Sequence, residues 1–92
     1  MTSALAIINE IKAAISQSRY PPWHFGLTND AAERKKYWGT KHRADLSRWQ
    51  EWVADSISEA RTVEGYFSGE NMLAGGTGGS LTGQNTVFVY IF

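Results

Sequence analysis

The stretch from Trp23 to Arg34 constrains the fold more than any other part of this sequence. Its first residues, through Thr28, are rich in aromatic and β-favouring side chains, which favour a short strand. Asp30 then provides helix-capping chemistry, and Glu33 three residues later has the spacing of a capping box, with Asp in place of Ser or Thr. The stretch is therefore predicted to be a strand, a tight turn and the start of a helix.

Two charged side chains are predicted to lie within the apolar faces of helices. At about 100° per residue, Arg34 falls between Tyr37 and Trp38, on the inner side of its helix. Glu64 projects in the same way into the apolar face of a second helix, predicted over Ile57–Phe67, whose start is marked by the capping-box spacing of Ser56 and Glu59. Because burying an unpaired charge is costly, each side chain requires a partner. We expect Arg34 and Glu64 to face each other.

The remaining apolar patterns complete the predicted elements. Isoleucines at steps of three and four predict an amphipathic helix over Ser3–Ser18. Residues Arg48–Ala54 fit both a helical stripe and a strand alternation, and we favour a short strand. Thr86–Phe92 is apolar on both faces, which indicates a central strand. The expected fold class is α+β, with a small, mostly antiparallel three-stranded sheet flanked by about three helices.

Two connecting segments are predicted to be loops. Gly39 is expected to end a helix over Ala31–Trp38, with a polar loop at 40–46 after it. The glycine-rich segment Gly69–Gln84 is the second loop, and its centre, Gly75–Gly79, suggests a phosphate cradle. That centre lacks the Gly-Lys-Ser/Thr of a P-loop. A loop tip or a close backbone approach explains it better.

Length and composition exclude several protein classes. A chain of 92 residues is expected to form one domain, residues 1–92. It has no cysteine for disulfides or thiolate metal sites, and its two histidines, His24 and His42, lack the paired spacing of zinc ligands. No stretch reaches the length of a membrane span, and the apolar N-terminus lacks a basic leader. We expect a cytoplasmic protein with no membrane attachment.

Positive charge is concentrated in one segment of a chain whose net charge is zero. Six of the nine Lys and Arg residues lie between positions 34 and 48, against a single acid there, Asp45. They are Arg34, Lys35, Lys36, Lys41, Arg43 and Arg48. Such a segment is typical of a phosphate-facing surface. It is equally typical of a solvated helix end and loop.

Together these pieces resemble the GIY-YIG endonuclease domain. His24-Phe25-Gly26 stands at the Tyr-Ile-Gly position, and Leu27–Asp30 follows as the turn. Arg34, eight residues after the glycine, falls at the family's arginine. Glu59–Glu64 matches the helix whose last carboxylate holds the metal in that family. The resemblance covers roughly residues 23–67.

The sequence departs from that family where the first strand should stand. A helix and two prolines precede Trp23, so the comparable strand is the C-terminal Val87–Ile91. We expect this strand to lie beside the Trp23–Thr28 segment, as in a circular permutation. Tyr90 then replaces the first motif tyrosine, and His24 replaces the second. Where the family often carries His or Tyr after its arginine, this chain has Trp38.

The resemblance implies metal-dependent phosphodiester hydrolysis on nucleic acid. In that reading Glu64 holds one Mg²⁺ or Mn²⁺, and Arg34 with the metal stabilises charge on the phosphate. His24 or Tyr90 orients or deprotonates water. The predicted catalytic set is His24, Arg34, Glu64 and Tyr90. Basic side chains would track the backbone by charge without reading bases, namely Lys35, Lys36, Lys41, Arg43 and Arg48.

Two other functions fit the same sequence. Arg34 and Glu64 can form a structural ion pair in a non-catalytic module of that fold, which binds nucleic acid or a protein partner. Alternatively, the chain is a small interaction protein that docks through its first helix or its basic loop. The tryptophans either stack on bases or fill the core and its rim; they are Trp23, Trp38, Trp49 and Trp52.

Overall fold

The computed structural model describes residues 2–17, 23–67, 73–78 and 86–92. These residues form α1 (Ala4–Gln17), β1 (His24–Thr28), α2 (Ala31–Lys41), β2 (Gln50–Val53), α3 (Ile57–Phe67), β3 (Leu73–Gly78) and β4 (Phe88–Ile91). The expected α+β class is confirmed, because three helices flank three strands that pair antiparallel. The strand β3 adds a fourth member to the sheet.

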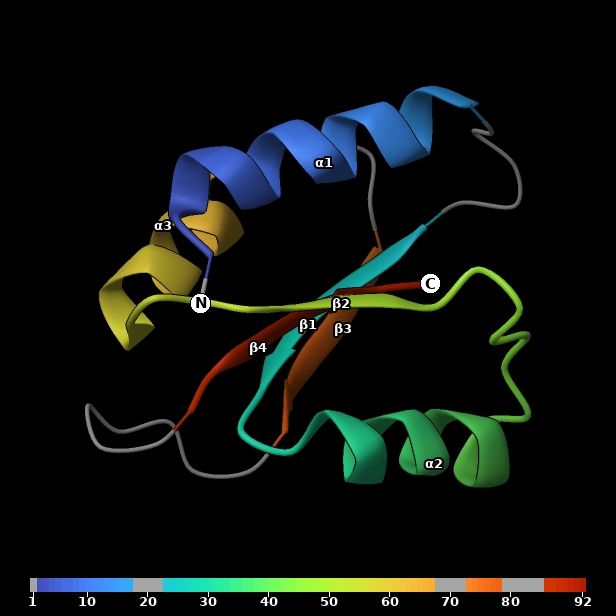
Figure 1. Cartoon of the computed structure of the whole chain (residues 1–92). Coiled ribbons are helices and arrows are strands. Elements are labelled where there is room, and N and C mark those ends of the chain that lie inside the picture. Colours follow the sequence, from blue (N-terminus) through green and yellow to red (C-terminus); the bar gives the residue numbers. More distant parts are fainter. Residues whose placement is uncertain (1, 18–22, 68–72, 79–85) are drawn as a thin grey trace.

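The sheet has the strand order β2-β4-β1-β3 (Figure 1). The strand β4 lies between β2 and β1 and pairs antiparallel with both. This confirms that the last strand is central and lies beside the Trp23–Thr28 segment. In this register Tyr90 lies opposite Gly26 on one side and Glu51 on the other. The strand favoured within Arg48–Ala54 is also confirmed, as β2.

The prediction of a loop over the glycine-rich segment is wrong for Leu73–Gly78. These residues form β3, which pairs parallel with β1. Glycine has low strand propensity, and no local pattern signals a strand here. The strand forms because β1, distant in sequence, supplies backbone hydrogen-bond partners whatever the side chains are. Residues 69–72 and 79–84 of the predicted loop lie outside the described residues.

Helices cover both faces of the sheet (Figure 1). The helices α1 and α3 lie together on one face, whereas α2 lies on the other. The core forms between the sheet and the α1–α3 layer, and includes Ile7, Ile8, Ile11, Phe25, Leu27, Ala60, Val63, Phe67, Val89 and Ile91. Burial of these apolar side chains holds α1 and α3 in place. In α2, by contrast, only Ala31 is buried.

The helix α2 extends past its predicted end to Lys41. Gly39 does not end it, because the helical hydrogen bonds continue to His42, whose N–H donates to the Trp38 carbonyl at 3.2 Å. Gly39 instead allows a close approach, since a Cβ at this position would lie 3.1 Å from Leu46 Cδ1. The predicted loop therefore begins later than expected.

The helix α1 lies within one residue of its predicted bounds at each end. Ser3 begins it, accepting a hydrogen bond from the Ala6 N–H through Oγ at 3.3 Å. Among the described helices, none combines the length and apolar character needed to cross a membrane.

Candidate nucleic-acid interface

The predicted strand, turn and helix between residues 23 and 34 are confirmed, and they position Arg34. Asp30 caps α2 by accepting a hydrogen bond through Oδ1 from the Glu33 N–H at 3.1 Å. Thr28, at the end of β1, accepts a hydrogen bond through Oγ1 from the Asp30 N–H at 3.1 Å. Because the turn is held in this way, the second turn of α2 directs Arg34 toward Tyr90 of the sheet.

Tyr90 anchors α2 to the sheet. Its side chain is fully buried, with 0% of its surface exposed. The hydroxyl oxygen accepts hydrogen bonds from Arg34 Nε at 3.1 Å and from Trp38 Nε1 at 3.2 Å. Arg34 also lies over the ring of Tyr37, with Cζ 4.4 Å from the ring centroid. The inward-facing guanidinium is thus supported by a buried hydroxyl and an aromatic face.

Five rings, which we call the aromatic cluster, lie between α2 and the sheet. His24 stacks on Phe92, with ring centroids 4.5 Å apart and an interplanar angle of 1°. Trp49 stacks on Tyr90 with centroids 4.8 Å apart. Trp38 contacts both His24 and Phe92, at centroid distances of 5.6 and 5.0 Å. Each such pair contributes about 0.5–1.5 kcal/mol beyond its buried area, so the cluster fixes α2 against the sheet.

His24 is held in this cluster as a half-buried ring. Burial lowers the pKa of His24 below its ordinary value of 6.5, because the charged form loses hydration. A hydrogen bond with the Phe92 backbone opposes this shift, and the positive charge of Arg48 adds to it. The neutral imidazole is therefore favoured near neutral pH, which suits its stacking on Phe92.

The predicted meeting of Arg34 with Glu64 is wrong. Arg34 lies on α2 and Glu64 on α3, and these helices cover opposite faces of the sheet (Figure 1). Glu64 Oε1 instead lies 3.7 Å from Arg61 Nη1, in a pair whose side chains are 42% and 56% exposed respectively. The helical wheel gives the side of a helix that a residue occupies. It does not give the sheet face that the helix covers, and from the margin of an apolar stripe a long side chain reaches water.

On α3, Glu59 is the carboxylate that makes a hydrogen bond to another element of the fold. Its Oε2 accepts a hydrogen bond from the Ala4 N–H at 2.6 Å, in the first turn of α1. Free N–H groups and the helix dipole both favour a negative charge at this end of a helix. Sequence reasoning gave Glu59 only the capping box of its own helix. Ser56 does cap α3, accepting from the Glu59 N–H at 3.2 Å.

The predicted Mg²⁺ or Mn²⁺ site at Glu64 does not fit this arrangement. The carboxylate lies beside Arg61 in the α1–α3 layer, away from Arg34 and Tyr90. Over the described ranges, no group of three or more His, Cys, Asp or Glu side chains is placed to hold a metal ion. Glu64 and Arg34 therefore do not lie together as the resemblance implies for a metal-dependent site.

We expect the variants Glu64→Ala and Glu59→Ala to differ sharply in stability. Loss of the exposed Arg61–Glu64 pair should change the free energy of unfolding by about 0.5 kcal/mol or less. Loss of Glu59 removes a charge-assisted hydrogen bond to Ala4, and should cost about 1.5–3 kcal/mol. Urea unfolding of both variants in parallel checks this. A loss of about 3–5 kcal/mol for Glu64→Ala would instead indicate a buried ion pair.

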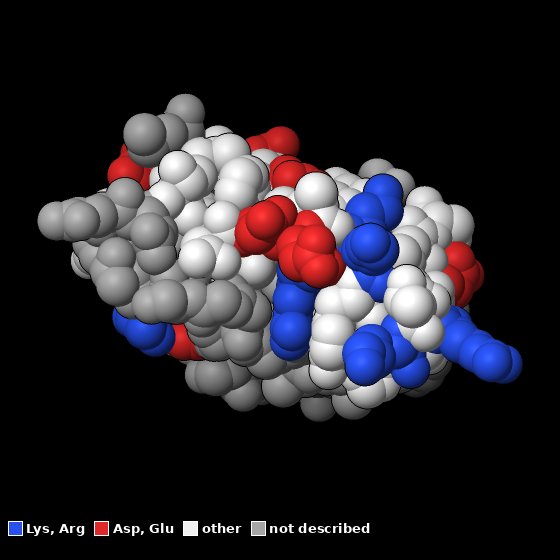
Figure 2. All heavy atoms as spheres, turned by 90° about the horizontal axis from the view of Figure 1, so that it is seen from below, with Lys and Arg blue, Asp and Glu red and all other residues white. Residues whose placement is uncertain are grey.

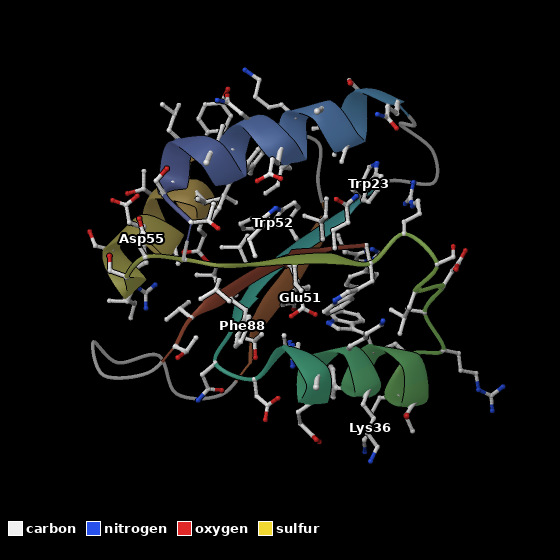
Figure 3. The ribbon with its side chains drawn as sticks, viewed as in Figure 1. Trp23, Lys36, Glu51, Trp52, Asp55 and Phe88 are labelled. Atoms are coloured by element: carbon white, nitrogen blue, oxygen red, sulfur yellow. The ribbon has the colours of Figure 1, made fainter. Side chains whose placement is uncertain are left out.

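The basic residues predicted to contact nucleic acid come from α2 and the segment after it. We call them the basic surface: Lys35, Lys36, Lys41, Arg43 and Arg48. Figure 2 views the molecule from the α2 side and shows Lys and Arg side chains gathered there, beside an acidic group. Lys36, Lys41 and Arg43 are exposed, and Lys36 points away from the sheet (Figure 3). Lys35 lies 6.0 Å from the Trp49 ring centroid, and Arg48 lies 3.9 Å from that of Trp23.

Sequence reasoning missed the part that Phe92 and Trp49 play in this site. A signal for Phe92 was present. Residues two apart on a strand lie on the same face of the sheet, so Phe92 was expected to share a face with Tyr90. The partner of Phe92 follows from the register, in which His24 and Phe92 exchange backbone hydrogen bonds at 2.7 and 3.1 Å. Trp49 precedes β2 and carries no equivalent signal; its Nε1 donates to Glu51 Oε1 at 3.0 Å.

Three of the four predicted catalytic residues lie on one side of the sheet. Arg34 and Tyr90 are in direct contact, and His24 belongs to the same aromatic cluster, whereas Glu64 lies on α3. Comparison of the chain with protein-family models, with curated proteins and with solved structures found no match.

Proposed function

We propose that this chain binds the phosphate backbone of nucleic acid through the basic surface. One observation carries the proposal: six of nine Lys and Arg residues occupy positions 34–48, against one acid, in a chain of zero net charge. This segment forms α2, which covers the face of the sheet opposite α1 and α3, and the connection that runs from α2 to β2 (Figures 1 and 2).

Local charge explains how a neutral protein could bind a polyanion. Charges separated by more than about 8 Å are largely screened at physiological salt, so a cluster on one face acts independently of acids elsewhere. Cations that contact phosphates release condensed counterions, which supplies sequence-independent affinity. Asp30 and Glu33 stand at the start of α2, so the attraction is directed to its other end, where Lys41 and Arg43 are exposed.

The aromatic cluster supports this function by holding α2 rigid. Trp38 and Arg34 attach the helix to the buried Tyr90 hydroxyl, and Lys36 projects from its outer side (Figure 3). A pre-ordered surface loses less conformational entropy on binding than a mobile one. We therefore assign Arg34 a structural role in the interface, as the residue that orients α2.

Phosphodiester hydrolysis is the less supported function. The GIY-YIG resemblance assigns catalysis to four residues that do not lie together. Three of them belong to α2 and the sheet, whereas Glu64 lies on α3, where it is paired with Arg61. Charge-driven binding needs no metal and uses side chains of α2 and of the segment that joins α2 to β2. A protein partner would need neither phosphate contacts nor a strong dependence on salt.

The proposal is tested by titrating the protein into fluorescently labelled oligonucleotides, in the presence of EDTA and over a range of salt concentrations. We expect log K to fall linearly with log salt, by about 0.7–0.9 for each phosphate contacted. Absence of binding at low salt would overturn the proposal. Mg²⁺-dependent cleavage that is lost in Glu64→Ala would overturn its non-catalytic part and restore the nuclease.

A further inference from the structure

We infer that Tyr37 and His42 form a stacking platform for an unpaired base, so that the basic surface prefers single-stranded nucleic acid. The inference rests on the proposed function and names its substrate class. Tyr37 is 37% exposed and His42 is exposed, although both are aromatic. They lie within the basic segment, and Lys36, Lys41 and Arg43 flank them in sequence.

The platform is fixed to the aromatic cluster beneath it. The Tyr37 hydroxyl and His42 Nε2 share a hydrogen bond at 3.1 Å, and the two ring centroids are 5.2 Å apart. Trp38 contacts both rings, with centroids 5.7 Å from Tyr37 and 4.7 Å from His42. Trp38 in turn donates its indole N–H to Tyr90. The exposed rings are therefore already ordered before any ligand arrives.

This combination of charge and exposed rings fits single strands better than duplexes. Unpaired bases offer a π-face to an aromatic side chain, whereas stacked base pairs do not. Proteins that bind single strands without sequence preference pair a basic groove or surface with such stacking. Arg34 covers part of the Tyr37 ring at 4.4 Å, which leaves the exposed part of the ring for the base.

The test compares four probes of equal length at one salt concentration: oligo(dT), oligo(U), a DNA duplex and an abasic DNA strand. Wild-type protein should bind the oligo(dT) and oligo(U) strands more tightly than the duplex or the abasic strand. Tyr37→Ala should weaken binding of both base-bearing strands about fivefold or more, and should leave binding of the abasic strand unchanged. Tyr37→Phe keeps the ring and should retain the preference.

Two controls separate stacking from folding. Tyr37→Leu keeps apolar bulk without a π-face, and should lose the preference while remaining folded by circular dichroism. Tyr66→Ala removes a comparably exposed tyrosine, 44% exposed, from α3 on the other side of the sheet, and should bind as wild type does.

The outcomes distinguish this inference from the function on which it rests. Equal affinity for all four probes, with Tyr37→Ala indistinguishable from wild type, would overturn the stacking platform while salt-dependent binding upheld the proposed function. Failure of every probe to bind at low salt would overturn both.

Discussion

Replacing Lys36 and Lys41 together by glutamine should weaken binding of single-stranded DNA roughly tenfold at physiological salt. The slope of log K against log salt should become shallower by about 1.4, because two phosphate contacts are lost at about 0.7 each on a single strand. Both side chains are exposed on α2, so the fold should be unaffected. Fluorescence anisotropy over a salt series measures both quantities.

A matched double variant exists on the other side of the sheet. Lys12 lies on α1 and Arg61 on α3, and both are exposed. Replacing both by glutamine removes the same amount of charge from the α1–α3 layer, so any effect of net charge alone is shared. We expect this variant to keep the wild-type slope. Equal losses in the two double variants would contradict an interface confined to the α2 side.

Tyr90→Phe should lower the free energy of unfolding by about 1–3 kcal/mol. The change removes only the hydroxyl, but it takes away the acceptor of the Trp38 and Arg34 hydrogen bonds in a fully buried position. In a domain of this size, each kcal/mol lowers the melting temperature by about 4–8 °C. Thermal unfolding followed by circular dichroism checks the prediction.

Hydrogen exchange locates the effect of this substitution. Amides of α2 should exchange faster in Tyr90→Phe, because the hydroxyl attaches this helix to the sheet, whereas amides of α1 and α3 should change little. Tyr66→Phe is the matched control, since it removes a hydroxyl from an exposed tyrosine. Wild-type stability in Tyr90→Phe would show that the hydroxyl does not hold α2.

Much of this fold could be predicted from local chemistry. The strand, turn and helix of residues 23–34 follow from their residue types, and the caps at Asp30 and Ser56 take the expected hydrogen bonds. The central position of β4 followed from its being apolar on both faces. The odd-numbered residues of β4 face α1 and α3, as the burial of Val89 in the core shows. The even-numbered residues face α2, as the contact of Tyr90 with Arg34 shows.

Features that depend on distant partners could not be predicted. The glycines of β3 give no strand signal, and only pairing with β1 makes a strand of them. Likewise, a helical wheel finds Glu64 near an apolar face, but the layer that α3 joins depends on how the whole sheet is covered. The same limit explains why Glu59, which caps α1 across the domain, was assigned only to its own helix.

The candidate site also has one part that the sequence predicts and one part that it does not. Arg34 with Tyr90 could be predicted, because the turn sets the helix and β4 lies beside β1. Figure 3 shows the alternation that completes it: Glu51 lies on the α2 side of β2 and Trp52 on the α1 side. Whether Trp49 would join Tyr90 depended on the register of β2 against β4, which residue types alone do not determine.

The most direct test of the central claim is an NMR titration of the labelled protein with oligo(dT) at low salt in EDTA. Backbone amide shifts should concentrate in α2 and residues 42–49, and amides of α1 and α3, including those around Arg61 and Glu64, should stay in place. Shifts centred on the α1–α3 layer, or none at saturating oligonucleotide, would contradict a nucleic-acid interface on the α2 side.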